Sequence, residues 1–338
     1  MDRELPEGLF GTGVVGAPMA GGPSRPALAE AVSRAGGVGF LAAGYKTPEA
    51  MAREVDELSA SGLAFGVNLF VPANEPVDRE AVLAYRERLR PLAERLGVDL
   101  PEPRWADDDA YPAKLAHLLE RVPPVVSFTF ALPPAGDVAS LRKAGAFVIQ
   151  TVTSPDEARA AEELGVDGVV VQSSAAGGHF AAFTSGPAFA GDLPDLVSAV
   201  RAAVGLPVLA AGGIGTPQAA RAVRAAGAAA VQLGTAFLRT PEAGTNPVHR
   251  AALADPAFAR TAQTRAFSGK AARGLENAFM RDFADAPAGY PTLHYLTAPL
   301  RAAAVAAGDP QGTNLWAGTG WREAREETAA EVVARFAE

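Results

Sequence analysis

The sequence contains no cysteine. This absence excludes disulfides, zinc–thiolate sites, iron–sulfur clusters and thiol nucleophiles. A basic excess is missing as well, because 30 Lys and Arg stand against 38 Asp and Glu, a formal net charge of −8. Without such an excess little is gained from counterion release, which argues against nucleic acid as the main partner.

Long apolar runs are also missing. No stretch of about 18 apolar residues free of charge, glycine and proline occurs, so no membrane-spanning helix is expected. The opening residues, Met-Asp-Arg-Glu, lack the apolar core of a signal peptide. We therefore expect a cytoplasmic protein with no membrane partner.

The residues that are present predict a large folded core, since 49% are hydrophobic and 20% are charged. Short apolar runs alternate with helix-like segments through the first 240 residues. The runs are apolar on both faces, which is typical of buried parallel strands. The candidate strands are Val14–Ala20, Gly37–Gly44, Phe65–Val71, Val125–Ala131, Phe147–Val152, Gly168–Gln172, Pro207–Gly213 and Ala229–Thr235.

The segments between these runs carry helix signals. Ser154–Gly165 and Thr216–Gly227 each begin with a Ser or Thr cap followed by Pro, and each ends in Gly. Pro26–Gly36 and Pro48–Gly62 are similar. Eight strand–helix units predict the α/β class and a (β/α)8 TIM barrel. An open doubly wound sheet is the rival fold, although its usual strand count is lower.

Two regions depart from this rhythm. Pro72–Pro124 is rich in Arg and Glu and predicts one or two surface helices. Beyond Thr240 the strand pattern stops: Thr240–Tyr290 reads as helical with turns, Pro291–Gly308 as a helix, and Trp321–Glu338 as an amphipathic terminal helix. We predict a barrel in residues 1–239, a small, mainly helical cap with the last barrel helix in residues 240–318, and a C-terminal helix in residues 319–338.

Glycines end the seventh and eighth candidate strands. Gly212 and Gly213 lie in AAGGIGT, and Gly234 follows Gln232-Leu233 and precedes Thr235. The loops after these two strands form the common phosphate site of a TIM barrel, where backbone N–H groups and a helix N-terminus face the anion. The alternative is that the glycines only make tight turns. The sequence favours phosphate binding.

A small-residue loop follows the sixth strand and carries one histidine. It reads QSSAAGGHF and includes Gln172, Gly177, Gly178 and His179. An imidazole at the barrel mouth is suited to general base catalysis near neutral pH, but a structural loop histidine is equally consistent with its position. The other histidines, His117, His249 and His294, lie in helical segments. They are expected on the surface or in packing, although His294 could face the site.

Polar groups lie at other strand ends. Asn68 and Gln150 have amides that can donate to and accept from a heterocycle edge. Ser127 is interpreted as a satisfied interior group, and small residues near Met19 would leave room for a flat ring.

Gly11–Gly16 matches G-x-G-x-x-G, but no strand precedes it and no helix follows, so a dinucleotide site is rejected. No clustered metal site is expected.

Several stretches together resemble one family. In order they are APMAGG at 17–22, GVNLF at 66–70, VSFTFALP at 126–133, AAGGH at 175–179, AAGGI at 210–214, QLGTAFL at 232–238, FSGKAARGLEN at 267–277 and NLWAG at 314–318. From about residue 10 to about residue 320 the chain resembles the flavin-dependent nitronate monooxygenases, formerly called 2-nitropropane dioxygenases.

The resemblance implies one non-covalent FMN and a catalytic base at His179. It implies that the Met19 backbone lies near the flavin ring and that FMN is held by Asn68, Gln172, Gly177, Gly178, Gly212, Gly213, Gln232, Gly234 and Thr235. Two departures from the family pattern, Phe180 and Thr129, bear on substrate preference more than on flavin binding.

The reaction implied by the resemblance is oxidation of an alkyl nitronate, such as propionate 3-nitronate, by O2 to a carbonyl compound and nitrite. The partners expected are a small-molecule substrate and O2, in a monomer or homodimer. The alternative is an FMN- and NADH-dependent reductase of enoyl thioesters or quinones in the same barrel. A non-redox isomerase or lyase is a weaker rival, because the candidate strands lack the Lys or Glu that such enzymes use.

Overall fold

The computed structural model describes residues 5–6, 8–72, 76–183 and 189–337. Eight parallel strands form one sheet in the order β1-β9-β8-β6-β5-β4-β3-β2. A parallel bridge between Val15 and Val38 joins its two ends into a barrel. This confirms the (β/α)8 prediction. The strands are β1 (Val14–Gly16), β2 (Gly39–Ala42), β3 (Phe65–Phe70), β4 (Val125–Thr129), β5 (Phe147–Val152), β6 (Gly168–Gln172), β8 (Val208–Ala211) and β9 (Ala230–Leu233).

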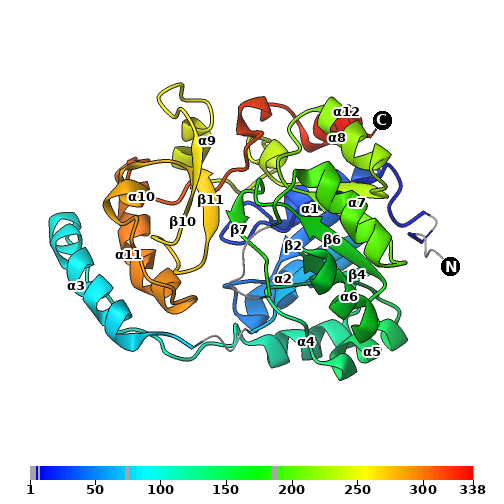
Figure 1. Ribbon diagram of the computed structural model, residues 1–338, viewed down its shortest axis with the longest axis horizontal. Coiled ribbons are helices and arrows are strands. Elements are labelled where there is room, and N and C mark those ends of the chain that lie inside the picture. Colours follow the sequence, from blue (N-terminus) through cyan, green and yellow to red (C-terminus); the bar gives the residue numbers. More distant parts are fainter. Residues whose placement is uncertain (1–4, 7, 73–75, 184–188, 338) are drawn as a thin grey trace.

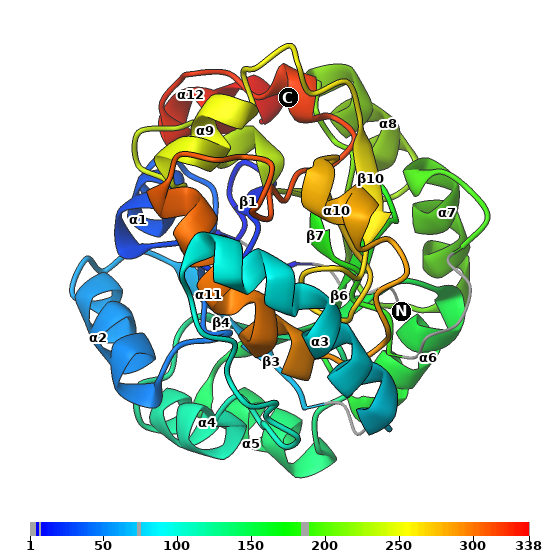
Figure 2. The same cartoon turned by 90° about the vertical axis from the view of Figure 1, so that its left-hand side faces the viewer.

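Helices surround the strands in a ring (Figure 2). They are α1 (Pro26–Arg34), α2 (Pro48–Ser59), α4 (Tyr111–Glu120), α5 (Ala135–Ala144), α6 (Pro155–Leu164), α7 (Leu193–Ala203), α8 (Pro217–Ala225) and α12 (Ala329–Phe336). The expected caps are present, since Ser154 and Thr216 accept backbone N–H groups at the starts of α6 and α8. α12 packs against α1 and α8 and completes the ring.

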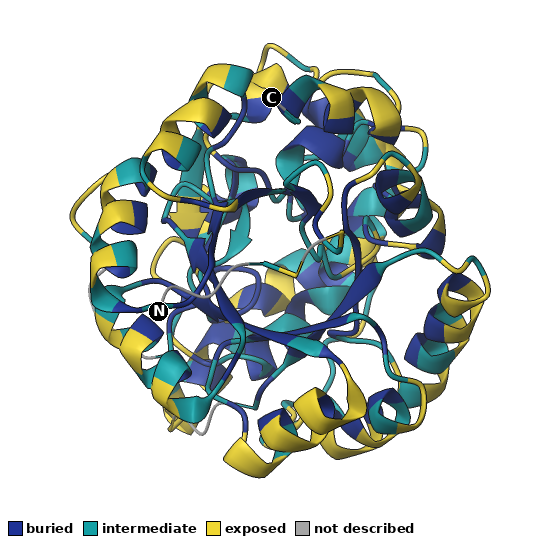
Figure 3. Ribbon diagram, turned by 90° about the vertical axis from the view of Figure 1, so that its right-hand side faces the viewer, coloured by how far each residue is buried: buried dark blue, intermediate teal, exposed yellow. Residues whose placement is uncertain are grey.

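The core lies between strands and helices. Figure 3 shows buried strands inside a ring of helices whose outer faces are exposed. Val67, Val126 and Val169 are fully buried in this layer, and each such side chain contributes roughly 1.5–3 kcal/mol relative to exposure. Burial on both faces explains why the strands lack an alternating pattern.

A second layer covers the barrel mouth. Helices α3 (Arg79–Leu96) and α11 (Thr292–Ala306) cross it side by side (Figures 1 and 2). Their facing side chains, among them Tyr85 and Leu296, form a separate hydrophobic cluster together with Phe267 from a turn before α11. The short helix α10 (Ala278–Asp282) contributes to the same cluster. Helix α9 (Pro247–Ala252) precedes α10 in the sequence. The region between β3 and β4 therefore supplies one of these two helices, α3.

A three-stranded antiparallel sheet corrects one expectation. Thr240–Tyr290 was expected to be helical with turns, but it contains β10 (Thr261–Thr264) and β11 (Ala272–Leu275). β11 pairs with β10 and with β7 (Gly178–His179), which lies in the loop after β6. These strands are too short and too polar to show a hydrophobic period. β7, the second partner of β11, is about 90 residues away in sequence, so the local sequence pattern does not predict this pairing.

The chain end also differs from expectation. Trp321–Glu338 is not one helix: a 3-10 turn, η2 (Trp321–Glu323), precedes α12. Thr328 and Glu331 form a capping box that begins α12, which fixes its start more strongly than the apolar pattern does. Residues 240–318 form no clearly separate cap, because β7 of the barrel pairs directly with β11. The division at residues 239 and 318 remains a prediction.

Within the described part of the chain, no helix combines the length and apolarity needed to cross a bilayer.

Candidate active site

His179 lies where the barrel mouth meets the cover. It belongs to β7 and pairs with Ala272 of β11. Its ring centroid is 5.4 Å from that of Tyr290, 5.7 Å from Trp316 and 5.9 Å from Phe130. Side chains from three distant parts of the sequence therefore surround one imidazole, and the pairing of β7 with β11 fixes its position.

A buried serine orients this ring. His179 Nε2 lies 2.7 Å from Ser268 Oγ, and Ser268 is 1% exposed. The hydroxyl also donates to the Lys270 carbonyl and accepts from the Lys270 N–H. Because the turn holds the hydroxyl in place, the hydroxyl in turn fixes the imidazole plane.

The surroundings keep His179 uncharged. Burial lowers its pKa to about 3, and the positive charges of Lys270 and Arg301 act in the same direction. Desolvation and nearby cations both disfavour the imidazolium. At neutral pH the ring is therefore a free base that can accept a proton.

A cavity lined by aromatic rings opens beside His179. We call it the aromatic cavity: its wall includes Tyr45, Phe70, Phe130, Tyr290 and Tyr295. The hydroxyls of Tyr45 and Tyr290 are 3.0 Å apart. His179 lies one side chain deeper, with its ring against two of these aromatic residues.

Charged residues of both signs also line the aromatic cavity. They are Asp107, Asp108, Asp109 and Lys270. Lys270 Nζ lies 5.0 Å above the Phe130 ring, a cation–π contact. The cationic group therefore lies on the side of the cavity where Phe130 meets His179.

Tyr45 is held by an ion pair behind it. Its backbone has a left-handed φ of 66°, and its N–H donates to Asp109 Oδ1 at 2.8 Å. Asp109 Oδ2 lies 2.7 Å from the ammonium of Lys114, which is fully buried and also donates to the Ala43 carbonyl. A non-glycine residue in this conformation needs such support.

His294 lies directly behind Tyr45. The two rings are stacked, with centroids 3.8 Å apart and planes 7° apart. Burial lowers the pKa of His294 to about 2, with Arg301 and His179 contributing. His294 was expected on the surface or in packing. The structure places it in packing, as the second layer of the cavity wall.

In three glycine-containing loops, which we call the glycine loops, backbone occupies the space of side chains. We give this name to residues 173–178 after β6, 212–215 after β8, and 234–235 after β9. Gly212 and Gly213 have φ of 110° and 75°. A Cβ on Gly213 would lie 2.9 Å from Ala175 Cβ, and one on Gly177 would lie 2.6 Å from Gly318 N. The segments approach so closely that side chains would not fit.

The glycine loops also present hydrogen-bond donors. Among the described residues, nothing accepts the backbone N–H groups of Gly213, Gly234 or Thr235. η1 (Thr235–Phe237) begins here, so its first N–H groups lack helical partners. The Thr235 hydroxyl accepts the N–H of Gly318 at 3.0 Å. Unpaired N–H groups at the ends of barrel strands suit an anion.

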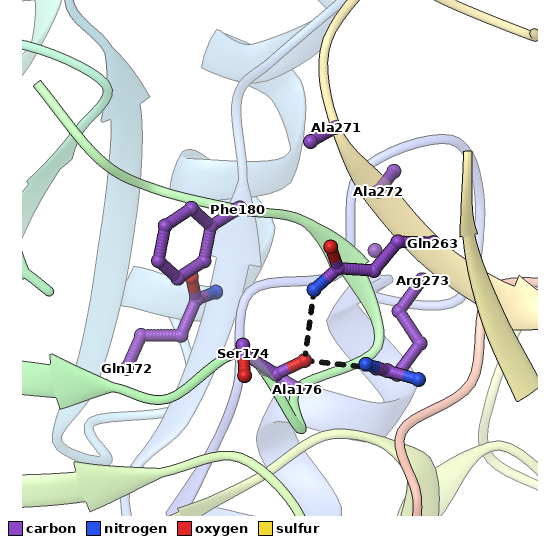
Figure 4. Close-up of a pocket in the computed structure, with 9 residues that line it drawn as sticks. Gln172, Ser174, Ala176, Phe180, Gln263, Ala271, Ala272 and Arg273 are labelled. Carbon is purple, nitrogen blue, oxygen red and sulfur yellow. Dashed lines mark hydrogen bonds between the residues drawn. The ribbon is translucent and has the colours of Figure 1, made fainter. Parts of the chain in front are cut away.

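Side chains from the cover brace the first glycine loop (Figure 4). Arg273 Nε and Gln263 Nε2 both donate to the Ser174 carbonyl, at 2.8 and 3.4 Å. Gln172 donates to the His179 carbonyl at 3.3 Å and accepts from the Ala181 N–H at 2.8 Å. The Gln172 amide therefore fixes its own loop and holds the segment that carries His179.

The side-chain amides of two interior residues, Asn68 and Gln150, differ in their hydrogen-bond partners. Asn68 is 2% exposed and donates to Ser127 Oγ and Thr129 Oγ1, both at 2.9 Å. This confirms Ser127 as a satisfied interior group. Gln150 donates to two carbonyls. Its buried Oε1 has no partner among the described residues, and such an orphaned acceptor points to a group that binds there.

The remaining predicted residues lie at the same end of the barrel. The Met19 N–H donates to Ser24 Oγ at 2.8 Å, and Met19 Sδ lies 3.6 Å from a Cβ built on Gly234. Gln232 pairs with Ala211 across β8 and β9. A Cβ on Gly178, whose φ is 77°, would meet no atom within 4 Å. The hydrogen bonds of the Asn68 side chain go to Ser127 and Thr129 of β4.

Sequence reasoning missed the supports of the site. Ser268, Tyr290 and Arg301 were not singled out, although Ser268 lies in the FSGK stretch and Tyr290 directly precedes a proline. They approach His179 only through tertiary contacts from more than 80 residues away. A motif could have flagged Ser268, but no local signal flags Tyr290 or Arg301.

Comparison with known proteins agrees with this arrangement. The family model described as nitronate monooxygenase matches residues 7–338. A nitronate monooxygenase of Pseudomonas aeruginosa is 40% identical, over 96% of this chain and 95% of its own length. The crystal structure of a nitroalkane oxidase from Streptomyces ansochromogenes has a TM-score of 0.94 at 48% identity, over 97% of this chain and 95% of that one. FabK from Thermotoga maritima is more distant, with a TM-score of 0.73 at 25% identity, over 96% of this chain and 90% of that one. The chain belongs to the nitronate monooxygenase family of oxidoreductases.

Proposed function

We propose that this protein uses FMN and O2 to oxidise alkyl nitronates to a carbonyl compound and nitrite. Propionate 3-nitronate and similar small nitro compounds are the proposed substrates. The observation that carries this proposal is the uncharged His179 beside glycine loops whose N–H groups are unpaired, in a chain of this family. The oligomeric state proposed is a monomer or a homodimer.

The residues present fit FMN. Gly212, Gly213, Gly234 and Thr235 would hold its phosphate through backbone N–H groups, which suits an acidic protein that places few cations there. Gly178 would leave room for close approach of the same group, because it borders open space, and Gly177 would let the loop pack against Gly318 beside it.

The amides would hold the flavin ring. Asn68, Gln172 and Gln232 would be its side-chain contacts, and the Met19 backbone would lie beside it. The orphaned Gln150 Oε1 supplies an acceptor for a ring N–H. When bound, FMN supplies the electron acceptor that the protein's own side chains lack.

His179 would act as the general base. A neutral nitroalkane must lose its α-proton before it becomes a nitronate, and His179 is the group proposed to take it. Its low pKa keeps the ring unprotonated at neutral pH, at the cost of a weaker driving force for proton transfer. Ser268 would keep the ring aligned, and a preformed nitronate would not need this step.

The aromatic cavity would bind and enclose the substrate. In the hydrogen bond between the Tyr45 and Tyr290 hydroxyls, one hydroxyl donates and the other accepts. The O–H of the accepting hydroxyl would then be able to donate to a nitro oxygen. Aromatic walls exclude water and so strengthen that hydrogen bond. The cavity suits a short alkyl chain with one polar end.

Oxygen uptake tests this proposal directly. Purified, FMN-loaded protein is mixed with propionate 3-nitronate without NADH, and oxygen consumption and nitrite release are measured together. We expect rapid uptake with matching nitrite. No uptake from a yellow protein, with NADH oxidation once an enoyl thioester or quinone is added, would instead establish the reductase. A colourless protein that does not bind added FMN would overturn the flavin assignment.

A further inference from the structure

One arginine of α11, Arg301, lies behind the aromatic cavity and forms no ion pair with a described carboxylate. Arg301 donates to Asn314 Oδ1 at 3.0 Å, to the His294 carbonyl at 2.7 Å and to Thr297 Oγ1 at 3.1 Å. All of these partners are uncharged. Among the described residues no Asp or Glu forms an ion pair with it, in contrast to Lys114 beside Asp109.

A cation in this setting is costly. Burial lowers the pKa of Arg301 to about 10, so the group remains charged at neutral pH without a partner of opposite sign. Enclosed charges are ordinarily paired, because desolvation without a partner is unfavourable. A partly buried, hydrogen-bonded but unbalanced cation is therefore suited to an anion that arrives from outside.

Two aromatic rings, those of His294 and Tyr45, lie between the Arg301 charge and the aromatic cavity. Arg301 Nη2 lies 3.4 Å from His294 Nδ1. The His294 ring is stacked on Tyr45, and Tyr45 lines the aromatic cavity. Among the described residues no carboxylate forms an ion pair with Arg301 or a hydrogen bond with His294, and both rings are uncharged at neutral pH. The Asp109 carboxylate accepts the Tyr45 N–H at the cavity end of this path, and the Lys114 ammonium lies 2.7 Å from it.

The neighbouring groups already respond to this charge. Burial lowers the pKa of His179 and of His294, and Arg301 lowers both further. Burial raises the pKa of Tyr45, and Arg301 opposes that rise. In all three cases Arg301 favours the more negative form of a group at the cavity.

We propose that Arg301 is a specificity-determining residue that biases the aromatic cavity towards anionic ligands with a planar pair of oxygens, the shape of a nitronate or carboxylate. Asn314, from the NLWAG stretch, positions the guanidinium. In this account Arg301 touches no reacting atom and acts through His294 and Tyr45. The inference rests on the proposed function for its substrate, but its test does not need turnover.

The test compares two ligands of nearly equal shape. Butyrate and butyramide differ mainly in charge, and Trp316, whose ring packs against His179, provides a fluorescence signal for binding. Dissociation constants for both are measured at pH 7 on FMN-loaded protein. The wild type is expected to prefer butyrate. Arg301→Gln should lower the ratio of butyrate affinity to butyramide affinity about tenfold. Arg301→Lys should retain most of the preference for butyrate.

Arg250→Gln is the matched control. Arg250 is another partly buried arginine whose partners are backbone carbonyls, on α9. Its loss should leave the ratio unchanged. Equal weakening of both ligands by Arg301→Gln, or no recovery in Arg301→Lys while the flavin spectrum and melting temperature stay normal, would overturn the proposal and show a structural role. If the wild type binds both ligands equally, the proposal is also wrong.

Failure of the proposed function would look different. A protein that oxidises no nitronate could still show the charge-dependent ratio, and a true nitronate oxidase could lack it. With turnover, the second readout is the split between KM and kcat: Arg301→Gln should raise KM for a nitronate about tenfold while KM for the neutral nitroalkane changes little.

Discussion

The glycine loops and the aromatic cavity lie at the same end of one barrel and are built in opposite ways. In the glycine loops the backbone supplies the binding groups, and a Cβ on Gly177 or Gly213 would collide with a neighbouring segment. In the aromatic cavity side chains supply the wall, from β3 and α11 and from the turns after β2 and β4 and before α11. At Gly177 and Gly213 the first region has no room for an added Cβ. The second region depends on which aromatic residue stands at each position of the wall.

The comparison teaches how the two proposed tasks, holding the FMN phosphate and deprotonating the substrate, separate. Holding a phosphate needs N–H groups in a fixed array, which strand ends and a short helix provide with little sequence information. Choosing and deprotonating a substrate needs a tuned imidazole, and tuning requires burial, charge and a positioned hydroxyl at once. Substitutions in one region should therefore leave the task of the other largely intact.

The largest expected effect is in the aromatic cavity. His179→Ala should lower kcat/KM for a neutral nitroalkane about 100- to 10,000-fold, because the base is lost. The loss on the preformed nitronate should be much smaller, and FMN should stay bound. His117→Ala on α4 is the control and should change neither rate. Equal loss on both substrates would contradict the role of His179 as a base.

The next effect is on stability. Phe267 is 1% exposed, stacks on Phe279 at 4.6 Å and meets the Trp316 ring edge-on at 5.5 Å. Phe267→Ala should lower the free energy of unfolding by about 3–5 kcal/mol, measured by denaturant titration. The cover should loosen around His179 while FMN affinity falls less than activity. A variant that loses FMN first would contradict the separation of tasks.

A smaller effect is expected in the glycine loops. Gly213→Ala should weaken FMN binding about tenfold, since the left-handed backbone alone disfavours a side chain by about 1–2 kcal/mol and a neighbouring Cβ lies 2.9 Å away. At saturating FMN the ratio of nitroalkane to nitronate activity should be unchanged. Gly97→Ala, at φ 65° with no atom within 4 Å, is the control and should leave FMN affinity as it is.

The smallest effect is a pH dependence of stability. The pKa of His294 is lowered to about 2 in the folded protein, whereas an unfolded histidine titrates near 6.5. Below pH 6.5 the unfolded chain takes up a proton that the folded one does not, so stability falls as pH is lowered from about 6.5 and is unaffected above it. The melting temperature between pH 7 and 4.5 should fall less steeply in His294→Phe than in the wild type. Parallel curves would contradict this.

The same contrast governs what the sequence reveals. Strands β5 and β6 were predicted to the residue, because burial on both faces produces short apolar runs. The starts of α6 and α8 followed from the caps Ser154 and Thr216. The glycine loops could be placed from spacing alone, since Gly after a late barrel strand is a local signal.

The aromatic cavity could not be predicted in the same way. His179 was found because it lies in a glycine-rich loop, but its partner Ser268 and the cover strand Ala272–Leu275 are long-range neighbours. Tyr45 and Arg301 carry no motif, and their roles arise from one stacked histidine between them. Positions defined by tertiary contact leave no periodic trace in the chain.

The most direct test of the account is to mix FMN-loaded protein with propionate 3-nitronate in the absence of oxygen and NADH, while following the visible absorbance of the flavin. We predict rapid bleaching in the wild type. His179→Ala, which retains FMN, should bleach with the nitronate but hardly at all with the neutral nitroalkane. Bleaching of the wild type by NADH alone, with none by the nitronate, would contradict the account.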